Sequence, residues 1–204
     1  MSKLHEALLY EQLPENKVRC HLCAHKCLIS EGRRGICKVR GNHGGKLFSL
    51  TYGKLIAAHV DPIEKKPLFH FYPGSSSFSI ASAGCNFRCE WCQNWEISQE
   101  YGEESIDGTA ETPPDSVIAS AKRSHCQSIS YTYTEPTVFF EYSYDVSKLA
   151  HAAGLKNVYV TNGYMSREMI DLYSPLLDAA NVDIKAFTDE ADRKSTRLNS
   201  SHES

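Results

Sequence analysis

The stretch FSIASAGCNFRCEWC, residues 78–92, joins a short β-rich run to three closely spaced cysteines, Cys85, Cys89 and Cys92. Three thiolates with the spacing C-x3-C-x2-C on one loop can bind three irons of a four-iron cluster and leave the fourth iron open. A structural zinc ion takes four ligands, and this segment has no fourth Cys or His at ordinary spacing. An incomplete zinc site or a buried cysteine cluster is the alternative. The stretch therefore predicts a strand over 78–82 followed by an iron–sulfur loop.

Beyond this loop, short apolar β-rich runs alternate with longer segments of helical periodicity. The runs predict strands over residues 78–82, 128–133, 157–161 and 181–186. The segments between them predict helices over residues 115–124, over 137–153 and from the N-cap Ser166 onward. The inward faces of the second and third helices are expected to hold Phe139, Tyr142, Val146, Leu149 and Ala153, and Met169, Ile170, Tyr173, Leu176 and Leu177. Strands joined by helical crossovers are parallel, so this region predicts an α/β fold, either TIM-like or doubly wound.

Polar residues follow, or lie on, the last three predicted strands. They are Glu135 after the second strand, Thr161 and Asn162 at the third, and Asp183 and Lys185 on the fourth. Parallel βα barrels build their active sites at the carboxyl ends of the strands, so we expect these side chains to share one site. Each also has an ordinary interpretation: a solvated loop carboxylate, a simple Asn-Gly turn and an internal ion pair.

The N-terminal region contains a second cysteine group. Its members are Cys20, Cys23, Cys27 and Cys37, with His21 and His25 between them. Four soft ligands in a segment with little apolar periodicity predict a small fold held together by metal. A zinc site and a second iron–sulfur cluster both fit this ligand set, and paired disulfides are the third interpretation.

Two further segments of this region have their own periodicity. Leu4, Ala7, Leu8 and Leu9 have helical spacing, so residues 1–19 predict an amphipathic strap that ends at Pro14. Residues 47–62 alternate in polarity and predict a strand or a hairpin around Gly53.

Composition limits the possible partners and compartment. The chain has 204 residues, with 22 Lys and Arg against 25 Asp and Glu. This balance supplies no positive field for a phosphate backbone, so we expect no nucleic-acid partner. The sequence shows no apolar run of about 18 residues and no secretory signal pattern, so we expect a cytoplasmic chain with no membrane partner. In that compartment eight cysteines indicate metal or redox chemistry.

The cysteine loop has the pattern C-x3-C-x-aromatic-C, with Trp91 before the last cysteine, and it resembles the signature of radical S-adenosylmethionine (SAM) enzymes. Together with residues 20–42 and 61–74, the frame Cys-Asn-Phe-Arg-Cys-x-x-Cys-Gln-Asn-Trp resembles the radical SAM enzyme of the AmmeMemoRadiSam system. That family is related to the pyruvate formate-lyase activating enzymes. The resemblance covers residues 10–191 and implies a partial (β/α)6 TIM-like barrel, here its first four βα units, with a small Cys-rich N-terminal metal-binding subdomain.

The resemblance also implies an oxidoreductase chemistry. The open iron of a 4Fe-4S cluster would bind SAM, and reductive cleavage would give a 5′-deoxyadenosyl radical that abstracts hydrogen from a protein or a small molecule. Flavodoxin or ferredoxin would donate the electron. The substrate would be a glycine of a partner protein or a compound of the AmmeMemoRadiSam pathway. The rival from another class is a non-enzymatic zinc-ribbon binding module on a remnant barrel.

The same resemblance assigns expected roles to individual residues. Trp91 would border the adenine, Glu135 would receive the cofactor's ammonium group, and Thr161, Asn162, Asp183 and Lys185 would contact the cofactor. The activating enzymes carry Gly-Gly-Glu-Pro where this chain has Tyr133-Thr134-Glu135-Pro136. Backbone contact by the glycine pair is therefore in doubt, whereas the acidic position is kept.

The expected domains are residues 1–75, the Cys-rich subdomain with its linker, and residues 76–191, the barrel. Residues 192–202 resemble the translation of a common sequencing adapter. We therefore expect a truncated chain with an artefactual tail at 192–204, and a disordered tail is the alternative. In the linker, Lys66 and His70 either reach the active site or pin the linker to the barrel. Cys126 is expected in the core.

Overall fold

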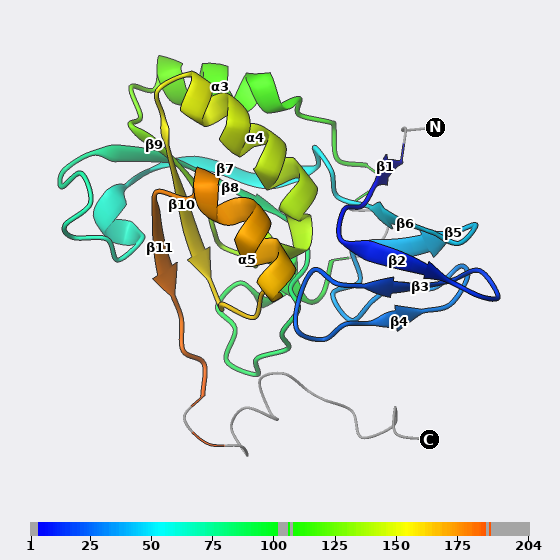
Figure 1. The fold of residues 1–204 in the computed structure, drawn as a ribbon. Coiled ribbons are helices and arrows are strands. Elements are labelled where there is room, and N and C mark those ends of the chain that lie inside the picture. Colours follow the sequence, from blue (N-terminus) through cyan, green and yellow to red (C-terminus); the bar gives the residue numbers. More distant parts are fainter. Residues whose placement is uncertain (1–3, 102–105, 107, 187, 189–204) are drawn as a thin grey trace.

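A five-stranded sheet forms the centre of the fold, in a computed structural model that describes residues 4–101, 106, 108–186 and 188. Its strands are β7 (Leu55–Pro62), β8 (Ser76–Ser82), β9 (Ser128–Tyr131), β10 (Lys156–Thr161) and β11 (Ala179–Val182), in the order β11-β10-β9-β8-β7 (Figure 1). Strands β8 to β11 pair in parallel, as the sequence predicted, and β7 pairs antiparallel with β8. Strand β9 is buried along its whole length, which is typical of a parallel strand covered on both faces.

The fourth parallel strand lies earlier than predicted. The sequence placed it over residues 181–186, whereas β11 ends at Val182 and only the backbone N–H of Asp183 still bonds to the sheet, at Thr161 O. The polar segment that contains Asp183 and Lys185 therefore follows the strand. Burial still alternates along this segment, since Asp183 and Lys185 are partly buried and Ile184 between them is 70% exposed.

Three helices pack along the sheet. They are α3 (Pro114–Arg123), α4 (Phe140–Ala152) and α5 (Arg167–Tyr173). Short elements complete this region: the 3₁₀ helices η1 (Ile63–Lys65), η2 (Pro136–Phe139) and η3 (Ser174–Leu176), and helix α1 (Trp95–Ser98) after the cysteine loop. The predicted helix over 137–153 thus begins as a 3₁₀ turn, in which the side chain of Glu135 accepts from Thr137 N. Ser166 caps α5 as expected, since its side chain accepts from Met169 N.

The predicted inward faces of two helices are partly wrong. Leu149 is 41% exposed and Ile170 is 48% exposed. In α4 the buried face is rotated toward Ser143 and Ser147, whose hydroxyls bond to buried tyrosines of the sheet and of α5. Because small polar residues occupy the buried face, an apolar residue is left on the surface.

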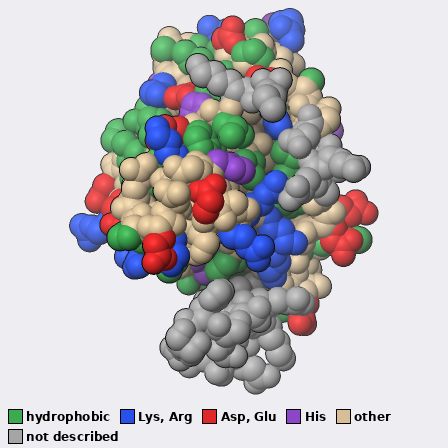
Figure 2. Space-filling view, turned by 90° about the vertical axis from the view of Figure 1, so that its right-hand side faces the viewer, with side chains coloured by type: hydrophobic (Ala, Val, Ile, Leu, Met, Phe, Trp, Pro, Cys, Tyr) green, Lys and Arg blue, Asp and Glu red, His purple; other side chains and the backbone are tan. Residues whose placement is uncertain are grey.

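The N-terminal strands form two small antiparallel sheets beside the large one (Figure 1). One contains β1 (His5–Glu6), β6 (Lys46–Ser49) and β5 (Arg40–His43). The other contains β2 (Tyr10–Leu13), β3 (Lys17–Cys20) and β4 (Leu28–Ile29). We call β1 to β6 the N-terminal sheets. Figure 2 looks onto the side of the molecule where they lie and shows basic side chains gathered near its centre.

The predicted amphipathic strap is wrong over the described part of residues 1–19, since β1 and β2 lie there. Leu9 has a φ of 49°, which breaks any helical run, and Leu4 and Leu8 are exposed. For residues 47–62 the strand alternative is confirmed, since β6 and β7 lie there, and the hairpin alternative around Gly53 is wrong. The chain does turn there, with a φ of 73°, but β6 and β7 on either side belong to different sheets.

A buried ion pair fastens the N-terminal sheets to the barrel helices. Arg40 of β5 donates to both carboxylate oxygens of Glu141 in α4, at 2.7 and 2.9 Å. Arg40 is 2% exposed and Glu141 is 1% exposed. Leu8 joins the pair through its backbone, donating to Glu141 at 2.8 Å and accepting from Arg40 at 3.2 Å.

A glycine allows a second close approach between these parts. Gly84, directly after β8, has a φ of 101°, and a Cβ there would lie 2.8 Å from Cγ1 of Val39. One hydrophobic core accordingly runs through both parts, with Val39 and Leu47 on one side and Phe139 and Val146 on the other. The boundary at residue 75 stays a prediction, although β7 of the large sheet precedes it.

Two other expectations concern the core and the tail. Cys126 is buried in the core as predicted. Residues 192–204 lie outside the described residues, so the truncation and the artefactual tail stay predictions. Among the helices that the structure describes, none combines the length and apolarity required to cross a bilayer.

Candidate functional site

A cleft of about 1,100 Å³ opens at the carboxyl ends of the parallel strands. Its walls come from the segments that follow β8, β9, β10 and β11. All nine barrel residues that the sequence singled out line this cleft: Cys85, Cys89, Cys92, Trp91, Glu135, Thr161, Asn162, Asp183 and Lys185. The parallel topology explains this convergence, because it brings the carboxyl ends of successive strands to one edge. The individual roles of these residues stay predictions.

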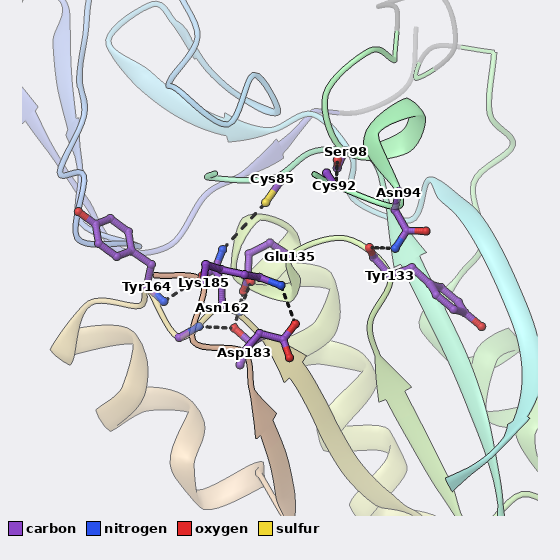
Figure 3. A network of polar contacts seen from close by, with 12 residues as sticks. Cys85, Cys92, Asn94, Ser98, Tyr133, Glu135, Asn162, Tyr164, Asp183 and Lys185 are labelled. Carbon is purple, nitrogen blue, oxygen red and sulfur yellow. Dashed lines mark hydrogen bonds and ion pairs between the residues drawn. The ribbon is translucent and has the colours of Figure 1, made fainter. Parts of the chain in front are cut away.

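The cysteine loop presents sulfur atoms to the cleft (Figure 3). Cys85 Sγ accepts from Phe87 N at 3.3 Å, and Cys92 Sγ lies 3.3 Å from Ser98 Oγ. Arg88 holds the loop against the N-terminal sheets, donating to Cys85 O at 3.0 Å and to Ile36 O at 2.7 Å. None of the three cysteines forms a disulfide within the described part of the chain.

The donor set of this loop fits an iron–sulfur cluster. Burial raises the pKa of Cys85 to about 12, so cluster binding has to displace its proton. Within residues 4–101, 106, 108–186 and 188, no three Cys, His, Asp or Glu side chains converge as they would around a single metal ion. A four-iron cluster does not require such convergence, because each of its thiolates binds a different iron.

Asn86 organises the site, and no sequence argument assigned it a role. It is fully buried, and its side-chain oxygen accepts from Asn162 Nδ2 at 2.7 Å, which links the cysteine loop to the turn after β10. Its backbone oxygen accepts from His25 Nε2 at 2.8 Å. The available signal was the position of Asn86 between the predicted ligands Cys85 and Cys89. Its hydrogen-bond partners are distant in the sequence, so the signal did not indicate its role.

Glu135 is a buried carboxylate with neutral partners. Its Oε1 accepts from Thr137 N, from Thr137 Oγ1 and from Thr161 Oγ1, at 3.0, 2.6 and 2.7 Å. Its Oε2 accepts from Asn162 N at 2.8 Å, which leaves acceptor capacity for a further donor. Burial raises the pKa of Glu135, and the hydrogen bonds partly oppose this shift. A cation placed in the cleft would stabilise the ionised form.

Asp183 and Lys185 form an ion pair on the same wall (Figure 3), with Nζ 2.8 Å from Oδ2. Burial by itself would lower the pKa of Lys185, but the neighbouring Asp183 outweighs burial and raises it. Both side chains are partly exposed in the cleft. They therefore offer one positive and one negative group to a zwitterionic ligand.

The opposite wall contains a cluster that the sequence did not anticipate. Tyr133 and Lys66 both bond to Asp61, with Lys66 Nζ at 2.7 Å from its carboxylate and 4.7 Å from the centre of the Tyr133 ring. Tyr133 has a φ of 64°, a left-handed conformation that favours glycine. Of the two alternatives for these linker residues, Lys66 fits the one in which it reaches the site, because it lines the cleft. His70 is exposed and is not among the residues that line the cleft. Trp91 is 53% exposed at the rim.

The N-terminal cysteines do not line this cleft. They surround a separate small cavity between the N-terminal sheets and the cysteine loop. Asn86 lines this cavity, and its side chain accepts from Asn162, which lines the cleft. The two predicted metal-binding groups are thus neighbours, although about fifty residues separate them in the sequence.

Comparisons with known proteins agree with this geometry. The profile of the radical SAM superfamily matches residues 79–203. Two curated proteins of Methanocaldococcus jannaschii are similar: the uncharacterized protein MJ0808, 48% identical over 186 residues, and the uncharacterized protein MJ0674, 26% identical over 187 residues. These alignments cover 91% and 88% of this chain but only 55% and 49% of the two relatives, so the chain spans about half their length. With more than half of its residues matched by the profile, this chain belongs to the radical SAM superfamily.

Proposed function

We propose that this chain generates a 5′-deoxyadenosyl radical from SAM and uses it to abstract hydrogen from a protein or small-molecule substrate. Membership of the superfamily implies a four-iron cluster and SAM. When bound, the reduced cluster supplies the electron that cleaves the sulfonium group of SAM. One observation carries the proposal: three cysteines, a buried carboxylate and an ion pair line one cleft of about 1,100 Å³.

The residues of the cleft have complementary tasks in this proposal. Cys85, Cys89 and Cys92 hold the cluster. The free acceptor capacity of Glu135 Oε2 binds the ammonium group of SAM, since a buried carboxylate makes strong bonds to a cation. The Asp183–Lys185 pair contacts the remaining polar groups of the cofactor, and Trp91 at the rim covers the adenine.

The substrate follows from the resemblance to activating enzymes. It is a glycine of a partner protein or a compound modified in the AmmeMemoRadiSam pathway. The electron donor in this proposal is flavodoxin or ferredoxin, and the enzyme is cytoplasmic. Support for a negatively charged donor comes from Arg33, Arg34 and Lys38, which are exposed in the turn around Cys37.

Anaerobic reconstitution tests the activity directly. The chain is incubated with iron and sulfide, purified, and mixed with dithionite and SAM, and methionine and 5′-deoxyadenosine are measured. Both products are expected, and Cys85→Ala should abolish them while Cys126→Ser, in the core, should not. Product formation that survives Cys85→Ala would refute the assignment. Zinc without iron or sulfide would instead support a non-enzymatic zinc-ribbon module.

A further inference from the structure

We propose that Cys20, Cys23, Cys27 and Cys37 bind a second metal centre through four thiolates. This centre joins the N-terminal sheets to the cysteine loop of the barrel. The proposal is independent of the radical chemistry, because it rests on a different cavity and on a different set of side chains.

Local backbone structure gathers the four cysteines. Cys20 ends β3, and its N–H bonds to Cys27 O at 3.0 Å, which closes the loop that contains Cys23. Cys37 approaches from the next turn, where Lys38 N bonds to Gly35 O at 2.8 Å. Gly35 lies close to this group, since a Cβ there would meet Ile29 Cδ1 at 3.2 Å, a tight contact, and Cys27 Sγ at 3.7 Å, an ordinary one.

The cysteine side chains line one small cavity of about 20 Å³. All four are free thiols, so no disulfide uses them. The remaining walls are mostly apolar and include Leu22, Ile29 and Val138. A small apolar cavity lined by four cysteines suits a structural site with four thiolate ligands.

An unpartnered guanidinium nitrogen gives an independent reason to place an anionic centre there. Arg40 lines this cavity and uses its terminal nitrogens on Glu141 and Leu8, but its Nε is buried without a hydrogen-bond partner. Buried N–H donors normally have a hydrogen-bond acceptor. Metal-bound thiolate sulfur atoms carry negative charge and can accept such a hydrogen bond.

Two occupants have the required chemistry, a zinc ion and a four-iron cluster, since both bind four thiolates. The cavity has room for about one ion, although no three of the described side chains already converge on one point. Zinc therefore needs side-chain rotation that draws the sulfur atoms together. A cluster needs the walls to move apart.

Metal analysis of a variant that lacks the barrel site tests the proposal. The variant combines Cys85→Ala, Cys89→Ala and Cys92→Ala, and is purified anaerobically both as isolated and after incubation with iron and sulfide. About one zinc, or about four irons with four sulfides, should remain per chain. Adding Cys20→Ser and Cys23→Ser should remove this metal, whereas adding Cys126→Ser should leave it in place.

Cobalt substitution and Mössbauer spectroscopy separate the two occupants, because only a tetrahedral cobalt thiolate gives intense visible ligand-field bands. Because a cysteine variant can fail to fold, protection of the thiols from alkylation is also measured in the unaltered chain. Alkylation followed by peptide mass spectrometry should modify the four N-terminal cysteines only after a chelator is added. Three results would each overturn the proposal. They are absence of metal in the triple variant, metal that survives Cys20→Ser and Cys23→Ser, and equal alkylation with and without the chelator.

Discussion

Replacing Glu141 with Gln should strongly destabilise the chain. The amide oxygen of Gln can still accept from Leu8 N and from one Arg40 nitrogen, but its NH₂ group then faces the other guanidinium nitrogen, which lies 2.7 Å from a carboxylate oxygen in the native pair. One charge-assisted hydrogen bond, about 1.5–3 kcal/mol, is lost. The buried guanidinium also loses its counter-charge, so the total loss should reach about 3–5 kcal/mol.

Urea unfolding followed by circular dichroism measures this loss as a change in the free energy of unfolding. For a chain of this length the expected fall in Tm is about 6–20 °C. The matched control is Glu15→Gln, which removes an exposed pair with Lys17 and should change the free energy by less than about 1 kcal/mol. If Glu141→Gln also stays within about 1 kcal/mol of the native chain, the buried pair does not hold the two parts together.

Three further variants test other features. Gly84→Ala should lower the free energy of unfolding by about 2 kcal/mol or more, because its φ of 101° strains any side chain and its Cβ would meet Val39. In thermal melts, adding Val39→Ala should relieve only the steric part of this loss. A Gly84→Ala variant as stable as the native chain would contradict the close approach. Asp61→Asn tests pH dependence. Burial would raise the pKa of Asp61, but hydrogen bonds from Lys65, Lys66 and Tyr133 outweigh burial and lower it below 3.8. The stability that Asp61 contributes is therefore complete above pH 3.8 and is lost as the pH falls through the lowered pKa, so the native and variant unfolding curves should draw together in acid; a constant difference would argue against the charge. Glu135→Gln should weaken SAM binding by about 10–100-fold in calorimetry, and unchanged affinity would remove Glu135 from the ammonium site.

The parallel sheet and the cleft could be predicted because their signals are local. Each strand is a short apolar run, and the residue after a parallel strand falls at the same edge whatever the details of packing. The N-terminal sheets could not be predicted in this way. Leu4, Ala7 and Leu8 have helical spacing in a short segment, whereas β1 pairs with β6 about forty residues away, which no local pattern shows.

Polar side chains with distant partners account for the remaining differences. Ser143 and Ser147 turn α4 by bonding to tyrosines of other elements, so hydropathy alone misplaced Leu149. Asn86 gains its role only when the turn after β10 and the loop of His25 are both in place. Spacing could identify the cysteines that fit a cluster, but it could not identify the amide that links them to the rest of the site.

Tyr133 has a side chain at a backbone position that favours glycine. Its left-handed backbone, with a φ of 64°, is disfavoured for a tyrosine, and glycine would relax it. The ring compensates by filling the space between Lys66 and the cleft, with its hydroxyl bound to Asp61. Position 133 thus narrows the binding volume from the side opposite Glu135. A Tyr133→Gly exchange would therefore relax the backbone and widen the cleft at this point.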